Sequence, residues 1–249
     1  MECIKVLYDY LDTFLNFLYP RNIYCILCNV PIDRHEGYSI CLDCKGKLRF
    51  IEEKACKKCG KPLDELYIID KCPECVHSLY FYTRAISCIE YDDLSKKVIY
   101  DLKYHKKRYI SYHIAEMICD RLIECNIYDF DVIIPVPLHK ARERERTFNQ
   151  AGIISKYIGK MTKTYVDNRN LIRVKNTITQ NKLTREERRE NLEGAFEVLD
   201  KAKVKSKNIL LIDDVFTTGL TANQCSRVLA ENGAVNVYIA TLATGRNVY

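Results

Sequence analysis

Eight cysteines in the first third of the chain form two copies of one spacing, C-x2-C-x12-C-x2-C. Each cysteine of the first copy recurs 31 residues later in the second copy, and Pro31 likewise recurs as Pro62. Two thiolates separated by two residues can reach one tetrahedral ion, so two such pairs are the spacing of a structural zinc site. The repeat therefore predicts two small zinc-binding modules in tandem.

The grouping of the cysteines follows from the fact that the whole unit repeats. We expect one Zn²⁺ ion to be held by Cys25, Cys28, Cys41 and Cys44, and a second ion by Cys56, Cys59, Cys72 and Cys75. A crossed pairing between the two units is the alternative. Four protein ligands leave no open coordination position, so both ions are expected to be structural and to contribute to folding. We also expect the ribbons to have a core of their own, separate from the rest of the chain.

The composition of the 249 residues, 47% hydrophobic and 29% charged, is that of a soluble globular protein. No run approaches the roughly 18 consecutive apolar residues of a membrane span, so none is predicted. The start of the chain lacks a basic segment followed by an apolar block, which predicts no secretory signal and a cytoplasmic location. Cysteines in that compartment hold metal more often than they form disulfides. The net charge of +6 permits a polyanionic partner without demanding one.

Three parts are expected along the chain. Apolar residues from Ile4 to Leu18 recur at helical spacing before Pro20, which predicts an amphipathic helix over residues 1–20. The double zinc ribbon should occupy residues 21–80. From residue 84 to 249 apolar runs alternate with helical stretches, which predicts an α/β domain with a doubly wound, mostly parallel sheet. Its predicted strands are 85–91, 132–136, 163–171, 209–212 and 235–242, and its predicted helices are 94–103, 110–125, 148–158 and 221–231.

The most informative segment of this domain follows the apolar strand predicted at 209–212. Asp213 and Asp214 come at the end of that strand, and a Thr/Gly turn then leads directly into a helix. Backbone amides at a helix N-terminus hold phosphate well, with threonine hydroxyls as further donors. Adjacent carboxylates can accept hydrogen bonds from the neighbouring hydroxyls of a sugar. Together these features predict a site for a ribose 5-phosphate, and the alternative is an ordinary strand–helix turn with an Asp cap.

This segment resembles the phosphoribosyl diphosphate loop of type I phosphoribosyltransferases. Further segments narrow the resemblance to the ComF family, and with the cysteine-rich start they cover nearly the whole chain. They are Asp101-Leu-Lys103-Tyr104, Pro135-Val-Pro137-Leu-His139, Phe148-Asn149-Gln150 after Arg146, and Arg188-Arg-Glu-Asn191-Leu-Glu-Gly194-Ala-Phe196. One position departs from the family pattern, because Thr147 stands where that family usually has glycine.

The resemblance implies a type I phosphoribosyltransferase-like fold that binds phosphoribosyl diphosphate, accompanied by Mg²⁺. The expected ligand contacts are Asp213, Asp214, Thr217, Thr218, Gly219, Thr221, Lys103, Pro135, Val136 and Pro137. Lys103 could equally be a helix C-terminal cation, and the two prolines could simply make a rigid connection. A lid is expected over the polar stretch that contains Gln180, Arg185, Arg188 and Asn191, for which a surface loop without a role is the alternative.

A nucleic-acid surface is suggested by lysines between and within the ribbons and by a basic run that follows Lys103. The candidates are Lys54, Lys57, Lys58, Lys106, Lys107 and Arg108. Cations near aromatic residues suit single-stranded nucleic acid, whose bases stack while its phosphates pair with Lys and Arg. A solvated basic surface is the alternative.

Resemblance to the ComF family implies a role in natural transformation, at the step where single-stranded DNA enters the cytoplasm. In that role the protein would act in partnership with a DNA translocase. An active phosphoribosyltransferase in nucleotide or base salvage is one alternative, and an inert scaffold for the translocase is another. If the chain is an enzyme, pyrophosphate would leave the anomeric carbon of the ribose, a reaction that positioning and charge stabilisation can accelerate. That chemistry needs no nucleophilic side chain, and we assign no residue of this sequence a catalytic role.

Overall fold

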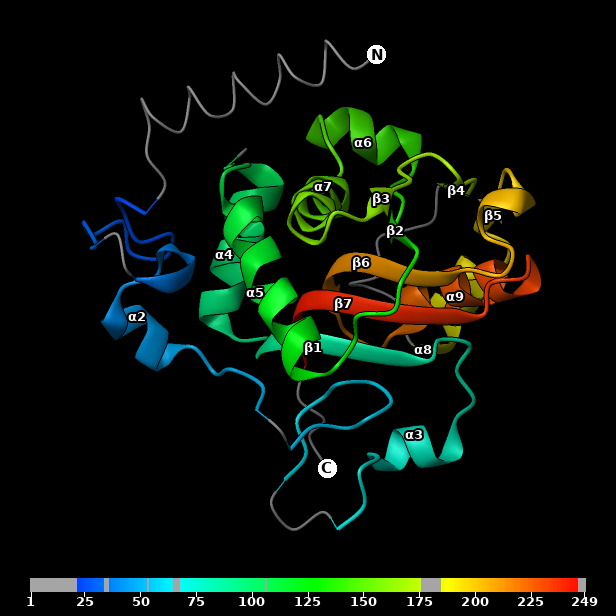
Figure 1. Ribbon diagram of the computed structural model, residues 1–249, viewed down its shortest axis with the longest axis horizontal. Helices are drawn as coiled ribbons and strands as arrows, with labels where there is room; N and C mark the ends of the chain where they lie inside the picture. The colour runs from blue at the N-terminus through cyan, green and yellow to red at the C-terminus, as the bar shows by residue number, and fades with distance from the viewer. Residues whose placement is uncertain are drawn as a thin grey trace. The chain divides into compact units, whose positions relative to one another are not determined.

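The computed structural model describes residues 22–33, 36–52, 54–64, 68–105, 107–175 and 185–245 (Figure 1). The helix predicted over residues 1–20 lies outside this part of the chain. The chain divides into two compact units, Met1–Leu48 and Arg49–Tyr249. Among the described residues, no helix is both long enough and apolar enough to cross a membrane.

The first unit holds the first cysteine module. Its initial knuckle is a tight turn in which the Cys25 N–H donates to the Val30 carbonyl, and the Asn29 N–H donates to the Cys25 carbonyl, both at 2.8 Å. Asn29 closes this turn with a φ of 63°, a left-handed conformation that asparagine tolerates better than most residues. A single 3-10 turn, η1 (Gly37–Ser39), then leads to α2 (Leu42–Lys47).

The second cysteine module repeats this backbone 31 residues later. The Cys56 N–H donates to the Lys61 carbonyl, and the Gly60 N–H donates to the Cys56 carbonyl, again at 2.8 Å. A short helix, α3 (Pro73–His77), begins directly after Cys72, just as α2 begins after Cys41. The sequence repeat is therefore also a repeat of local structure.

Gly60 shows why the two knuckles differ at one position. Its φ is 71°, and a Cβ atom placed on it would come within 2.6 Å of the Ala85 carbonyl oxygen. The Ala85 N–H in turn donates to the Lys58 carbonyl at 2.8 Å. Because the second knuckle packs directly against a strand backbone, only glycine fits there without a shift.

The centre of the second unit is a five-stranded parallel sheet in the order β1-β7-β6-β2-β3. Its strands are β1 (Arg84–Glu90), β2 (Val132–Pro135), β3 (Tyr165–Val166), β6 (Asn208–Phe216) and β7 (Asn236–Thr244). The main helices between them are α4 (Asp93–Tyr104), α5 (Ile110–Glu124), α7 (Gln150–Thr162) and α9 (Leu220–Glu231). The expected α/β fold with a mostly parallel sheet is confirmed.

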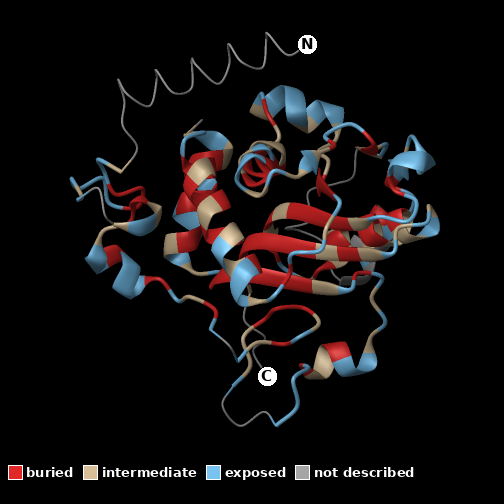
Figure 2. Cartoon of the chain, viewed as in Figure 1, coloured by how far each residue is buried: buried red, intermediate tan, exposed pale blue. Residues whose placement is uncertain are grey.

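Successive residues of a strand point to opposite faces of the sheet, and in this sheet other elements cover both faces. Ile209 and Leu211 of β6 lie in one hydrophobic cluster with Cys225 of α9. On the other face, α5 and α7 pack against the strands and against each other. Figure 2 shows the strands of the sheet as buried along most of their length.

The second zinc module shares its core with the sheet. Its four cysteines belong to the same hydrophobic cluster as Tyr82, Ala85 and Phe216. The rings of Tyr82 and Phe216 meet edge to face with centroids 6.0 Å apart. For this module the prediction of a separate core is wrong, because residues 82–85 run from the ribbon straight into β1.

Two strand predictions differ from the structure. The stretch 163–171 does not form one strand but contributes β3 to the main sheet and begins β4 (Leu171–Arg173), which pairs antiparallel with β5 (Phe196–Val198). Between them the Asp167 carboxylate accepts hydrogen bonds from the N–H groups of Arg169 and Asn170, a local turn that interrupts the strand. In contrast, β6 continues beyond residue 212 to Phe216 because its pairing with β7 persists.

Several short elements were not predicted, and three of them carry many charged residues. They are α6 (Lys140–Arg146), α8 (Arg185–Leu192) and the 3-10 turn η3 (Lys201–Lys203). The sequence of α6 alternates basic and acidic residues and buries none of its side chains. A helix without an apolar stripe has no periodicity to reveal it.

Candidate functional site

The two cysteine groups have the geometry of zinc sites. Within each group, all four Sγ atoms lie within 4.8 Å of one another. The Sγ atoms of Cys28 and Cys41 are 3.6 Å apart, and those of Cys59 and Cys72 are 3.7 Å apart. A tetrahedral Zn²⁺ with Zn–S bonds of about 2.3 Å sets its sulfurs roughly 3.8 Å apart, so both groups fit the ion. The uncrossed grouping predicted from the repeat is the one that the structure forms.

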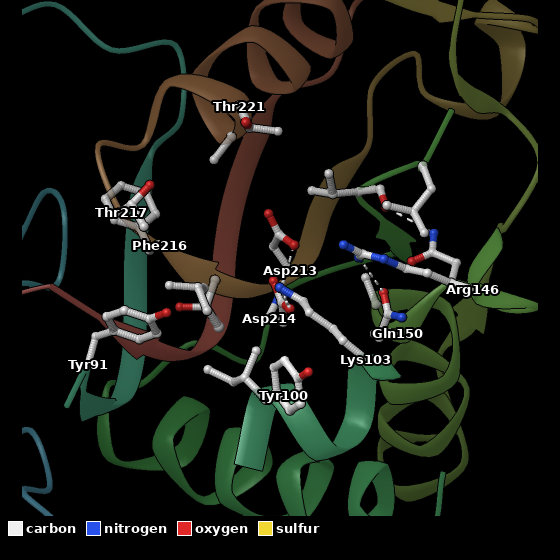
Figure 3. Close-up of a pocket in the computed structure, with 18 of the residues that line it drawn as sticks. Tyr91, Tyr100, Lys103, Arg146, Gln150, Asp213, Asp214, Phe216, Thr217 and Thr221 are labelled. Carbon is white, nitrogen blue, oxygen red and sulfur yellow. Dashed lines mark hydrogen bonds and ion pairs between the residues drawn. The ribbon is translucent and has the colours of Figure 1, made fainter. Parts of the chain in front are cut away.

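A separate cavity of about 760 Å³ opens at the carboxyl ends of the parallel strands (Figure 3). Its volume is within the range of about 300–1,000 Å³ that small-molecule sites occupy. The walls come from α4, the connection after β2, α6, the start of α7, β4 and the connection between β6 and α9. This is the edge at which parallel α/β sheets bind their ligands.

Asp213 and Asp214 lie at the centre of the cavity, near the end of β6. Lys103, in the last turn of α4, forms an ion pair with the Asp214 carboxylate (Figure 3). The Asp214 N–H donates to Oδ1 of Asp213 at 2.8 Å. The two consecutive acids therefore have different surroundings, because Asp214, and not Asp213, has a cation in direct contact among the residues that the structure describes.

The electrostatics of the pair follow from these surroundings. Burial and the negative charge of Asp214 raise the pKa of Asp213 to about 7, although Lys103 offsets part of this rise. Burial alone would lower the pKa of Lys103, but the charge of Asp214 and the hydrogen bond to it raise that pKa above its usual value. Lys103 is therefore a permanent cation, whereas Asp213 changes its charge near neutral pH.

The turn between β6 and α9 forms the wall next to the acids. Gly219 precedes α9 with a φ of 72°, and a Cβ atom there would lie 2.5 Å from Cζ of Phe216. No side chain caps the helix at Gly219. The N-terminus of α9 borders the cavity, which Thr217, Gly219, Leu220 and Thr221 line.

Three arginines line another part of the cavity, and none of them was among the predicted ligand contacts. Arg142 and Arg146 come from α6, and Arg173 comes from β4. Arg146 donates to Oε1 of Gln150 at 3.3 Å. Burial and the positive charge of Arg142 lower the pKa of Arg173. Together with Lys103, these side chains give the cavity a strongly cationic side.

Most of the predicted ligand contacts come together in this cavity. The lining includes Lys103, Val136, Pro137, Asp213, Asp214, Thr217, Gly219 and Thr221. Pro135 and Thr218 are not part of the lining. Pro135 is buried at the end of β2, and Thr218 Oγ1 accepts a hydrogen bond from the Leu220 N–H at 3.5 Å.

The connection after β2 is held by its own backbone. The Val136 N–H donates to the Ile212 carbonyl at 2.8 Å, and the Val136 carbonyl accepts from Nδ2 of Asn149 at 3.0 Å. The Pro135-Val136-Pro137 turn is therefore tied both to β6 and to the residue before α7.

The predicted lid is only partly within the described chain. Gln180 lies outside it, and the side chains of Arg185 and Arg188 are not described although both residues belong to α8. Asn191, also on α8, is partly buried and does not line the cavity. The lid remains a prediction.

The ribbon lysines predicted to bind DNA have neighbours within the protein. Lys57 forms an ion pair with Asp70, and the Lys58 ammonium donates to the Tyr82 carbonyl. Lys54 is exposed. Lys58 thus helps to anchor the ribbon to the segment that leads into β1.

Two residues of the basic run that follows Lys103 also contact other side chains of the protein. Lys107 donates to Oδ2 of Asp101 at 2.8 Å, and the Arg108 guanidinium lies 4.4 Å from the centroid of the Phe148 ring. Lys106 lies outside the described residues. Thr147, where the family usually has glycine, has a φ of 68° and accepts a hydrogen bond from Arg108 at 3.4 Å. This left-handed conformation explains a preference for glycine at that position.

Comparison with known proteins places these sites in context. Residues 14–76 match the double zinc ribbon domain family. Competence protein F of Haemophilus influenzae is 26% identical over 224 residues, which cover 82% of this chain and 96% of that protein. Competence protein ComFC of Bacillus subtilis is 26% identical over 231 residues, with coverage of 86% and 91%. The resemblance to the ComF family is confirmed.

Other relatives of this chain carry a different name. The DNA utilization protein YhgH of Escherichia coli O157:H7 is 26% identical over 219 residues, 86% of this chain and 94% of that protein. Solved structures with some likeness include an adenine phosphoribosyltransferase from Thermoanaerobacter pseudethanolicus, at 12% identity and a TM-score of 0.35 over 56% of this chain and 83% of the other.

Proposed function

We propose that this chain is a ComF-like DNA-utilization factor that binds phosphoribosyl diphosphate in the cavity of its sheet domain and also binds single-stranded DNA. One observation carries the ligand proposal. A single cavity combines the N-terminus of α9, two adjacent carboxylates and a group of cationic side chains. A sugar bearing phosphate groups at both ends needs these three kinds of contact.

Each part of the ligand has a matching part of the cavity. The 5-phosphate would lie at the start of α9, where Thr217 and Thr221 add hydroxyl donors. The ribose hydroxyls would donate to Asp213 and Asp214. The diphosphate would then lie against the cationic side, near Lys103 and the arginines, because charge-assisted hydrogen bonds to phosphate are the strong ones.

Mg²⁺ is compatible with this arrangement, since carboxylate and phosphate oxygens are its preferred ligands. Asp214 is already paired with Lys103, so Asp213 is the residue placed to contact a magnesium ion that arrives with the diphosphate. The ion would neutralise part of the diphosphate charge. The protein's own contribution is to hold the sugar phosphate in one orientation.

The DNA part of the proposal is supported by the names of the relatives, which refer to competence and to DNA utilization. The net charge of +6 is compatible with a polyanionic partner. The proposal includes a cytoplasmic location and a DNA translocase as a partner.

Isothermal titration with phosphoribosyl diphosphate and Mg²⁺ tests the ligand proposal. We expect the double variant Asp213→Asn, Asp214→Asn to bind at least about 10-fold more weakly than the unmodified chain, since hydrogen bonds to charged groups are worth about 1.5–3 kcal/mol each. The control variant Glu143→Gln, Glu145→Gln changes two exposed acids of α6 outside the cavity and should bind normally. Equal affinity in all three folded proteins would remove the ribose contacts from the acidic pair.

A further inference from the structure

One face of α4 lines the mouth of the cavity, and it combines aromatic and cationic side chains. Lys96, Lys97, Tyr100, Lys103 and Tyr104 all contribute to the lining. Each of the other four lies three or four residues from Tyr100 along the helix, the spacing at which side chains are neighbours on the helix surface. Lys103 is engaged with Asp214, whereas Lys96, Lys97, Tyr100 and Tyr104 are exposed.

The tyrosines of this region are unusually exposed for large rings. Tyr100 is 54% exposed and Tyr104 is 51% exposed, and their ring centroids lie 4.7 Å apart. Tyr91, which follows β1, lines the same cavity and is 38% exposed. Figure 3 shows Tyr91 and Tyr100 on the same side of the acidic pair. Rings grouped at the mouth of a polar cavity are available to stack with a planar partner.

Lys96 is positioned beside one of these rings. The Lys96 ammonium lies 5.7 Å from the centroid of the Tyr91 ring. Its ion pair with Asp93, at 2.9 Å, has side chains that are 52% and 97% exposed. A pair this exposed contributes little, so Lys96 can exchange Asp93 for a phosphate at small cost. The Arg146 guanidinium lies 5.5 Å from the centroid of the Tyr104 ring.

We propose that this surface, the α4 platform of Tyr91, Lys96, Lys97, Tyr100 and Tyr104, binds single-stranded nucleic acid. A base stacks on Tyr100 at the mouth of the cavity, and phosphates of the strand pair with Lys96 and Lys97. Aromatic rings interleaved with cations are the recognition chemistry of single strands, because every base has a face that can stack. The inference rests on the proposed function for the nature of the polymer, and it specifies where that polymer binds.

The platform distinguishes single strands from duplexes. The rings lie at the mouth of a cavity, where a base can reach them only after it leaves its own stack. A duplex offers its phosphates but keeps its bases paired, so it would contact only Lys96 and Lys97. Stacking should therefore add affinity for single strands that does not depend on salt, whereas the lysine contribution weakens as salt rises.

The test measures binding of a fluorescent oligothymidylate of about twenty nucleotides by anisotropy, using the full chain loaded with zinc. Tyr100→Ala should weaken binding by about 10-fold, within the range for loss of one stacked base. Tyr100→Phe keeps the ring and should bind like the unmodified chain. Tyr109→Ala removes a tyrosine that is 53% exposed outside the cavity and serves as the matched control.

The lysines are tested by the salt dependence of the same binding. Lys96→Ala with Lys97→Ala should lower the slope of log affinity against log salt by about 1 to 2 units, since each phosphate contact in a single strand contributes about 0.7. Lys201→Ala with Lys205→Ala changes two exposed lysines that do not line the cavity and should leave the slope unchanged. Tyr100→Ala should lower affinity without changing the slope.

Phosphoribosyl diphosphate titration of the same variants separates this inference from the proposed function. Unchanged DNA affinity in Tyr100→Ala, or equal losses in Tyr100→Ala and Tyr109→Ala, would overturn the platform. A failure of the unmodified chain to bind oligothymidylate would also overturn it. If the chain binds DNA through Tyr100 but does not bind phosphoribosyl diphosphate, the ligand proposal fails and the platform stands.

Discussion

Lys103 in the last turn of α4 and Asp214 near the end of β6 form an ion pair across the floor of the cavity. Their side chains are only 22% and 12% exposed. The pair joins a helix to the central strand of the sheet, and it neutralises one of the two adjacent acids. The charge that a ligand meets at this point is therefore set largely by Asp213.

Removal of the lysine should be costly because it leaves Asp214 without its cation. We expect Lys103→Met to lower the free energy of unfolding by about 2 kcal/mol, less than the 3–5 kcal/mol of a completely buried pair. Adding Asp214→Asn should recover much of this loss, since the uncompensated charge is then gone. Urea denaturation checks both expectations, with Lys96→Met as the control for an exposed pair. A loss below about 0.5 kcal/mol in Lys103→Met would contradict the buried-pair interpretation.

The raised pKa of Asp213 predicts a pH dependence of stability. Its pKa is about 7 in the folded chain, above the ordinary value of 3.8, so the folded state binds the proton more tightly than the unfolded state does. The stabilising contribution of this proton is complete below about pH 4 and is lost as the pH rises toward 7. We therefore expect Asp213→Asn to gain stability relative to the unmodified chain between pH 5 and pH 8. Urea denaturation of both proteins across this range would contradict the assignment if the difference stayed constant.

Features that depend on neighbours in sequence were predictable. The cysteine repeat identified both zinc sites, because all four ligands of each site lie within twenty residues. The run from residue 209 to Thr221 identified the acidic pair and the turn before α9 for the same reason. In each case a short segment carries nearly the whole arrangement, and local periodicity is enough to reveal it.

Features that depend on tertiary contacts were missed. Arg173 lines the cavity from β4, far along the sequence from both Lys103 and Asp214. The break at Asp167 depends on side-chain hydrogen bonds that strand propensity does not describe. Tyr100 was within reach of sequence analysis, since it lies three residues before Lys103 on the same helical face.

The shared core of the second ribbon predicts that its zinc also stabilises the sheet. We expect metal analysis to find two Zn²⁺ ions per chain, and Cys59→Ser to lower the free energy of unfolding of the second unit by more than about 3 kcal/mol. Cys28→Ser, which changes the exposed cysteine of the first site, is the control and should leave that transition unchanged. One ion per chain in the unmodified protein, or identical sheet unfolding in Cys59→Ser, would contradict this description.

Thr147 predicts a stabilising substitution. For a β-branched residue, a φ of 68° costs about 1–2 kcal/mol of backbone strain. Glycine would relieve this strain, although it loses more chain entropy on folding. We expect Thr147→Gly to raise the free energy of unfolding by up to about 1 kcal/mol. Lys163→Gly, at an unbranched residue with a φ of 57°, should gain less. A destabilised Thr147→Gly would show that the Thr147 side chain contributes more than its backbone costs.

The proposal that the cavity binds phosphoribosyl diphosphate as a whole is tested most directly by comparing that ligand with its two halves. Isothermal titration of the zinc-loaded chain with Mg²⁺ should show one site per chain. Phosphoribosyl diphosphate should bind at least about 10-fold more tightly than ribose 5-phosphate or pyrophosphate, because its linked groups engage both sides of the cavity at once. Each half should also displace it. If pyrophosphate binds as tightly as the whole ligand and ribose 5-phosphate does not compete, the cavity is only an anion site and the account is wrong.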